Sequence, residues 1–249
     1  MAINLTRSIP VLTVKNRQLV KTLKFGNPKY VGDPINAIKV FNDKEVDELM
    51  LIDIGASVQG KDPDYAHLKE MAGEAFMPLG YGGGIQDFDI AQKVFQCGIE
   101  KVVLNTAAYE KPELISQIAT HYGSQSVVIS LDYKKALLGG KKPVYFSSKK
   151  NVKGSIMELA MRMEAAGAGE IILHNVDRDG TFEGYDLDVL KEVVANTRIP
   201  IVPLGGAGDI LDFTKAIEQA GAHAVAASSM FIFKKNNRDS ILINYQKIN

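Results

Sequence analysis

Eight short apolar runs, rich in β-branched residues, alternate along the chain with amphipathic segments. The runs predict strands at 9–14, 49–54, 77–82, 101–105, 127–132, 170–174, 200–204 and 223–227. In the segments between them, apolar residues recur at i, i+3, i+4 and i+7, which is the spacing of a helix that buries one face. Runs that are apolar on both faces are typical of parallel strands covered by helices.

Eight strand–helix units in 249 residues predict an α/β fold, a (β/α)8 TIM barrel, as one domain spanning 1–249. A doubly wound open sheet is the competing fold. The segment 133–154 is too long and too polar for a tight loop, and we interpret it as a hairpin-like insertion that turns near Gly139 and Gly140. On the catalytic face it would act as a lid, and a plain surface insertion is the alternative.

Two parts of the sequence repeat each other. The stretch "YGGGIQDFDIAQKVFQCGIEKVVLNTAA" (81–108) resembles "LGGAGDILDFTKAIEQAGAHAVAASSMF" (204–231), and Glu48 and Glu170 stand at equivalent strand starts. The repeat predicts a barrel built of two similar half-barrels, each with its own binding site.

Composition excludes several classes of function. The 29 basic and 29 acidic residues cancel, so nothing favours a nucleic-acid or membrane partner. No apolar run approaches the roughly 20 residues of a membrane span, and no signal peptide is recognisable. The single cysteine, Cys97, excludes a disulfide framework and indicates a cytoplasmic protein. The four histidines lack metal-ligand spacing, so we expect no metal or cofactor.

Two glycine clusters, 82–84 and 205–208, follow apolar strands and precede helices. Backbone N–H groups at such helix starts bind phosphate, although simple turns would also need glycine. Each cluster pairs with hydroxyl or amide residues at the end of the next strand. The sequence therefore predicts one phosphate site with Gly84, Asn105 and Thr106, and another with Gly206, Ser228 and Ser229.

Polar residues end several strands, where a barrel has its active site. Asp53 and Asp132 end the second and fifth strands, whereas the first strand ends in Thr13. We expect burial to raise the pKa of Asp132 and to suit it for proton transfer. In "DRDGT" (177–181), catalysis and a turn are equally good interpretations of the aspartates. Lys21 would meet a phosphate or remain solvated, and His174 could face the site.

Four charged residues lie at the opposite end of the barrel: Arg7, Glu48, Lys101 and Glu170, at or just before alternate strand starts. We expect one ring of two cations and two anions across the barrel floor. Such a ring would be a structural salt-bridge network or a gate for a small polar molecule.

Motifs in order along the whole chain resemble the cyclase subunit (HisF) of imidazole glycerol phosphate synthase. They include "VGDP", "DELMLIDI", "PLGYGGGI", "KVVLNTAA", "GAGEIIL", "GGAG" and "ASSMF". The resemblance implies a half-barrel duplication with two phosphate sites, and a HisH-like glutaminase docked on the N-terminal face. Ammonia would cross the barrel past a charged gate. The implied substrate is a bis-phosphorylated ribulosyl formimino aminoimidazole carboxamide ribotide, and the products are imidazole glycerol phosphate and the aminoimidazole ribotide.

By this resemblance, the floor ring matches the gate, the two glycine clusters match the phosphate sites, and Lys21, Asp53, Asp179 and Gly180 match substrate-contacting positions. Asp132 matches one of two catalytic aspartates. The other position holds Thr13, in "IPVLTVK". A Thr hydroxyl cannot act as a general base near neutral pH, and losing such a group costs about 10²–10⁴-fold. Leu204, His174 and Asn175 are further departures.

Within the family, the start of the chain resembles the glycosyl-amidation-associated (WbuZ-like) branch, with "IPVL", "LVKT" and "NPKYVGDPINA". That resemblance implies that ammonia is fed to an ATP-dependent sugar amidotransferase, which amidates an N-acetyl sugar of a surface polysaccharide or flagellin glycan. The first hypothesis is therefore an ammonia-conducting, cyclase-like subunit serving sugar amidation. A histidine-biosynthesis cyclase with altered acid–base chemistry is the second, and a non-catalytic scaffold that activates the glutaminase is the third.

Overall fold

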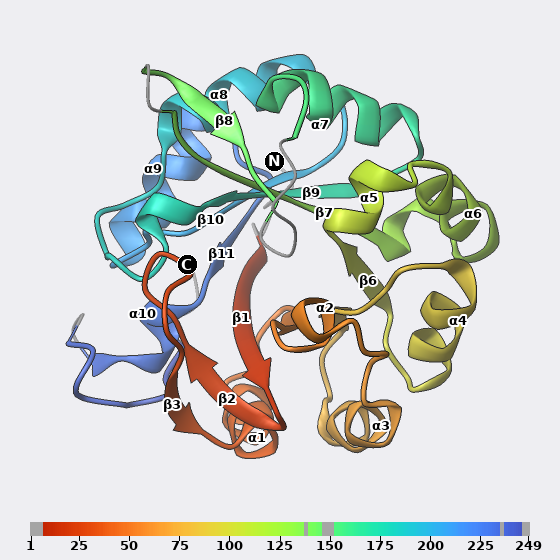
Figure 1. Cartoon of the computed structure of the whole chain (residues 1–249). Helices are drawn as coiled ribbons and strands as arrows, with labels where there is room; N and C mark the ends of the chain where they lie inside the picture. Colours follow the sequence, from red (N-terminus) through yellow and green to blue (C-terminus); the bar gives the residue numbers. More distant parts are fainter. Residues whose placement is uncertain (1–6, 137–138, 146–151, 235–236, 246–249) are drawn as a thin grey trace, which may run out of the picture.

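The computed structural model describes residues 7–136, 139–145, 152–234 and 237–245 (Figure 1). Within these ranges, eight parallel strands follow one another around a barrel, each hydrogen-bonded in register to its neighbour or packed beside it. β11 pairs with β1 through Arg7 and Ala224, which closes the ring. The strands are β1 (Arg7–Lys15), β4 (Leu49–Asp53), β5 (Leu79–Gly82), β6 (Lys101–Leu104), β7 (Val127–Lys135), β9 (Glu170–Asn175), β10 (Ile201–Leu204) and β11 (Ala224–Ala227). All eight predicted strands are present, so the TIM-barrel prediction is confirmed.

Helices surround the barrel (Figure 1). The longer ones are α1 (Pro34–Asp43), α3 (Tyr65–Glu74), α4 (Phe88–Gln96), α6 (Glu113–Tyr122), α7 (Ile156–Ala165), α8 (Leu187–Asn196) and α9 (Ile210–Ala220). Single turns form α2 (Ala56–Gln59), α5 (Thr106–Glu110), α10 (Ser229–Ile232), η1 (Ser124–Ser126) and η2 (Val176–Arg178). The two repeats fold alike: Asp87 caps α4 and Asp209 caps α9, each through its side chain.

Strand alternation divides the core into two parts. Outward residues pack under the helices, as Leu12 and Leu173 do. Inward residues such as Ile9, Val11 and Ile172 fill the barrel interior. Because side chains at i and i+2 share a face, each inward column runs from the floor to the mouth.

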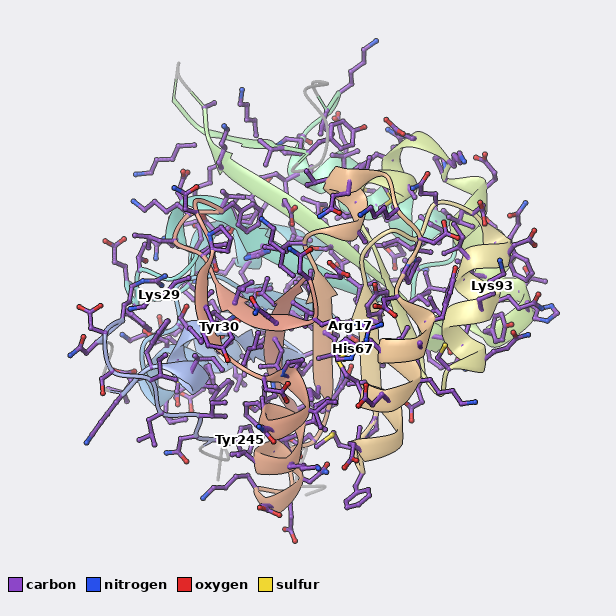
Figure 2. The ribbon with its side chains drawn as sticks, turned by 60° about the horizontal axis from the view of Figure 1, so that its bottom comes forward. Arg17, Lys29, Tyr30, His67, Lys93 and Tyr245 are labelled. Atoms are coloured by element: carbon purple, nitrogen blue, oxygen red, sulfur yellow. The ribbon has the colours of Figure 1, made fainter. Side chains whose placement is uncertain are left out.

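Two hairpins extend the barrel at its mouth. β2 (Gln18–Lys21) folds back on β1, and β3 (Lys29–Gly32) pairs with β2. Lys29 and Tyr30 of β3 are labelled in Figure 2. The second hairpin joins β7 to β8 (Lys141–Pro143), and the Lys141 ammonium lies 2.5 Å from the Asp186 carboxylate.

Only the second hairpin was expected. It falls within the predicted insertion 133–154, of which 137–138 and 146–151 lie outside the described residues. Its role as a lid stays a prediction, since its described residues beyond Asp132 do not line the mouth cavity. The β2–β3 hairpin was missed, and it supplies Thr22 and Phe25 to that cavity.

Candidate functional site

The four charged residues of the floor lie in direct contact. Arg7 begins β1, Lys101 begins β6 and Glu170 begins β9, while Glu48 directly precedes β4. The Arg7 guanidinium donates to both glutamates, and the Lys101 ammonium lies 2.8 Å from Glu48 and 3.0 Å from Glu170. Burial lowers the pKa of Arg7, but the two carboxylates outweigh it and raise that pKa. The Arg7 guanidinium therefore keeps its charge between the two glutamates.

One apolar layer separates this ring from the mouth. Val103 lies two residues after Lys101, and Ile172 lies two residues after Glu170, so each sits above its charged neighbour on the inward face. Two strand residues span about 7 Å. Both apolar side chains also line a cavity of about 400 Å³ at the mouth.

The mouth cavity brings together most of the predicted site residues. Its lining includes Thr13, Asp53, Gly84, Asn105, Thr106, Asp132, Asp179 and Ser228. Lys21, Gly180, Gly206 and Ser229 do not line it. The first predicted phosphate site is thus open to the cavity, whereas the second contributes only Ser228.

Thr13 is bonded to a buried lysine rather than to a carboxylate. The Lys21 ammonium, carried on β2, donates to the Thr13 hydroxyl and to the Val11 carbonyl, each at 3.2 Å. Burial strips water from the ammonium and lowers the pKa of Lys21 to about 8, although the Asp179 charge opposes this. Lys21 is thus neither solvated, as one interpretation had it, nor exposed to the cavity.

Asp132 lies inside a polar pocket at the end of the barrel interior. Its carboxylate accepts hydrogen bonds from the Ser130 hydroxyl and the Asn105 amide, both at 3.0 Å. Burial nevertheless raises its pKa, as expected, and the nearby His174 only partly offsets this. The raised pKa makes Asp132 better suited to hold and pass on a proton than an exposed carboxyl group is.

His174 occupies the space between two carboxylates. Its Nδ1 lies 3.6 Å from Asp132, and its Nε2 lies 3.8 Å from Asp179. The edge of Phe25 packs on the imidazole, with ring centroids 4.8 Å apart. The expectation that His174 faces the site therefore agrees with its place in the cavity lining, and His174 is also a departure from the family pattern. Its position four residues after Glu170 on the same strand was the signal that it points inward.

Asp179 anchors the β2–β3 hairpin. The Thr22 hydroxyl donates to its carboxylate and the Lys24 N–H to its carbonyl, both at 2.9 Å. The Arg238 guanidinium donates to the carbonyls of Thr22 and Gly180. Burial raises the pKa of Asp179, but His174, Lys21 and Thr22 outweigh it and lower that pKa. Asp179 is the fixed anion of the mouth.

The glycine clusters allow close approach of the backbone. A Cβ on Gly83 would lie 2.4 Å from the Asp53 carbonyl, and one on Gly206 would lie 2.1 Å from the Gly184 carbonyl. Asp53 itself accepts from the N–H groups of Gly55 and Ala56, so it orders the turn before α2 while lining the cavity. These contacts require glycine at both loops whether or not phosphate binds.

In the second predicted phosphate site, the Ser228 hydroxyl donates to the Val11 carbonyl. The buried Ser229 hydroxyl has no hydrogen-bond partner within the described part of the chain. Among the same residues, no cluster of three His, Cys, Asp or Glu side chains could hold a metal ion. No described helix is long and apolar enough to cross a membrane.

Comparison with known proteins gives one consistent family. Residues 7–237 match the family "Histidine biosynthesis protein". A Pseudomonas aeruginosa protein, provisionally named imidazole glycerol phosphate synthase subunit hisF2, is 47% identical over 98% of this chain and 96% of its own length. A protein from Leptospira borgpetersenii with a provisional HisF name is 43% identical over 96% of this chain and 94% of its own. The imidazole glycerol phosphate synthase subunit HisF of Chlorobium phaeobacteroides is 39% identical over 92% and 91%.

Proposed function

This chain belongs to the histidine biosynthesis family and is HisF-like, and from that premise we propose that it is the ammonia-receiving barrel of a glutamine amidotransferase complex. A HisH-like glutaminase docks on the N-terminal face and releases ammonia at the floor ring. The ammonia passes the apolar layer and reaches a phosphorylated small molecule in the mouth cavity. Asp132 serves there as a proton carrier.

The floor ring is the observation that carries this proposal. Burying the carboxylates of Glu48 and Glu170 carries a large desolvation cost, which their two cations must offset. Here the ring lies one apolar layer below a cavity that is lined with polar groups. A ring of charged groups beneath a polar cavity suits the passage of a small polar molecule such as ammonia.

Thr13 supports a reduced cyclase activity. Its hydroxyl accepts from Lys21 and cannot take a proton near neutral pH. We expect purified protein with ammonium chloride to turn over the bis-phosphorylated ribulosyl substrate slowly. Thr13→Asp would restore a carboxylate beside Lys21 and raise the rate by about 10²-fold or more, as measured by product absorbance. If Thr13→Asp turned the substrate over no faster than wild type does, the claim that Thr13 limits the cyclase activity would be contradicted.

Ammonia transfer has its own test. The protein is assayed with the glutaminase subunit that co-purifies with it, using glutamine labelled with ¹⁵N in the amide. Label in the product of the barrel, at a yield that excess unlabelled ammonium dilutes only weakly, is the expected result. Free exchange of the label with the solvent pool would contradict passage through the barrel.

A histidine-biosynthesis cyclase is the second candidate function. It is favoured by Asp132 and by the first predicted phosphate site, since both line the cavity. Growth of a histidine auxotroph on the wild-type gene would support it, and growth only with Thr13→Asp would support the first candidate.

Sugar amidation is the finer form of the proposal. It is supported by the N-terminal resemblance, while the described residues carry no feature specific to an ATP-dependent amidotransferase. Co-purification of such an enzyme with the barrel and its glutaminase, and amidation of an N-acetyl sugar by the three together, would test it. A barrel that binds and activates the glutaminase without any effect of Asp132→Asn would instead indicate a scaffold.

A further inference from the structure

We propose that His174 is a catalytic acid–base residue of the mouth cavity, which works with Asp132 in place of the carboxylate that is missing at Thr13. The inference rests on the proposed function, because it assumes that ammonia reacts with a ligand held in this cavity. It assigns a role to a residue that the resemblance marks only as a departure from the family.

The first argument is position. Glu170, Ile172 and His174 form one inward column of β9, so the imidazole stands directly above the apolar layer and the floor ring. The imidazole lines the mouth cavity together with Thr13 and Asp132. Ammonia that passed the ring and the layer would therefore arrive beside His174.

The second argument is the pair of neighbours. Asp132 lies 3.6 Å from Nδ1, and Asp179 lies 3.8 Å from Nε2. A carboxylate beside one ring nitrogen orients an imidazole and stabilises the imidazolium that forms when the other nitrogen takes a proton. Both distances exceed a hydrogen bond, but such contacts commonly tighten only when a ligand is bound. Nε2 is buried and has no hydrogen-bond partner among the described residues.

The third argument is the charge around the ring. Asp132 faces it from β7 and Asp179 from the turn after β9, so a carboxylate flanks each ring nitrogen. The charge of Lys21, on β2, helps to lower the pKa of Asp179, and the charge of Arg238 helps to lower the pKa of Lys21. Phe25 covers one edge of the ring and limits access of water. A neutral imidazole has one nitrogen that accepts a proton and one that donates, which suits it to proton transfer in both directions.

The step that follows needs no cofactor. Ammonia adds to an electrophilic carbonyl carbon of the ligand, so a C–N bond forms and two protons must move from nitrogen to oxygen. His174 accepts each proton at Nδ1, on the side of Asp132, while the buried Nε2 faces Asp179. The imidazolium returns each proton to the oxygen, which leaves as water when the C–O bond breaks. The balance is C=O plus NH₃ giving C=NH plus H₂O, with His174 regenerated.

The test compares four proteins with ammonium chloride and the bis-phosphorylated ribulosyl substrate: wild type, His174→Gln, Thr13→Asp and the double variant. We expect His174→Gln to lower kcat by about 10²-fold or more, with KM little changed. The acidic limb of the wild-type pH profile should disappear. In the Thr13→Asp background, the same change should cost less than tenfold, because the carboxylate supplies the second group.

His67→Gln is the matched control. His67 is a buried histidine of α3, beside Arg17 in Figure 2, and it does not line the mouth cavity. It should leave the rate and the pH profile unchanged. Thermal unfolding checks that the variants fold, and His174→Asn replaces His174→Gln if the latter does not.

Two results would overturn the proposal. One is a His174 variant, folded and assayed as above, with the wild-type rate and pH profile. The other is wild-type turnover no faster than that in solvent, because a working acid–base pair must accelerate the reaction. Neither result touches the ammonia-receiving function, which is judged by transfer of labelled nitrogen from glutamine.

Discussion

The floor and the mouth of the barrel contain the same kinds of charged group but pair them differently. At the floor, each of two cations donates hydrogen bonds to both glutamates, so every charge is in direct contact with opposite charge. At the mouth, gaps of 3.6 Å and 3.8 Å separate His174 from Asp132 and Asp179, and Lys21 is bonded to a hydroxyl and a carbonyl.

The pKa shifts follow this difference. At the floor, the carboxylates raise the pKa of Arg7 and hold its charge. At the mouth, burial raises the pKa of Asp132 and lowers that of Lys21 to about 8, so each group moves toward its neutral form. Contact with opposite charge therefore keeps the proton on Arg7 at the floor. At the mouth, desolvation without such close contact shifts the pKa values of Asp132 and Lys21 toward the neutral forms.

Breaking the floor should have the largest effect. Glu170→Gln leaves Arg7 and Lys101 to share Glu48, so the ring gains an uncompensated positive charge. We expect the free energy of unfolding to fall by about 3–4 kcal/mol, toward the low end of buried pairs because Arg7 is one-third exposed. Urea unfolding measures this loss. The control, Glu218→Gln on the exposed face of α9, should change little, and an equal loss in both would contradict the comparison.

Lys21 offers the next largest effect. Its pKa in the folded protein is about 8, below the ordinary 10.5, so the unfolded chain binds the proton more tightly. Stability must therefore rise with pH between about 8 and 10.5, by up to about 3 kcal/mol. Urea unfolding at pH 7 and pH 10.5 should show this rise in wild type and lose it in Lys21→Met. Lys191→Met, at an exposed position of α8, should keep the rise in stability. The same rise in Lys21→Met would contradict the assignment of the lowered pKa to Lys21.

The barrel was predictable because its strands are continuous apolar runs, buried on both faces, and its helices carry one apolar face. The eight predicted strands agree with the observed ones to within about two residues at most ends. The β2–β3 hairpin was not predictable in the same way. Gln18–Lys21 and Lys29–Gly32 are four residues each. The turn that folds β2 back on β1 uses left-handed backbone at Asn16 and Arg17 rather than a Gly signal.

The candidate site was predictable where a side chain ends an inward column. Asp132 and the floor ring were found because strand position alone places them, and the structure brings the ring together. The contact of Lys21 with Thr13 could not be predicted, because it depends on how the missed hairpin folds back. His174 carried a usable signal in its spacing from Glu170. Its two carboxylate neighbours come from β7 and from the turn after β9, and sequence spacing does not measure such distances.

Asp132→Asn should have the smallest effect on stability, and it is the most direct test of the difference between the mouth and the floor. Burial raises the pKa of Asp132, so the folded protein holds its proton at higher pH than the unfolded chain does. The ionised carboxylate therefore costs stability above the ordinary pKa of 3.8, and the amide removes that cost while keeping the shape. We expect the variant to be more stable than wild type at pH 7, by about 1 kcal/mol, with the advantage shrinking toward pH 4. Urea unfolding at both pH values measures it, with Asp62→Asn in an exposed loop as the control. Turnover should fall even as stability rises. A variant that is less stable than wild type at pH 7 would mean that the Ser130 and Asn105 hydrogen bonds outweigh the desolvation of the carboxylate. The mouth would then stabilise its charged groups as the floor does.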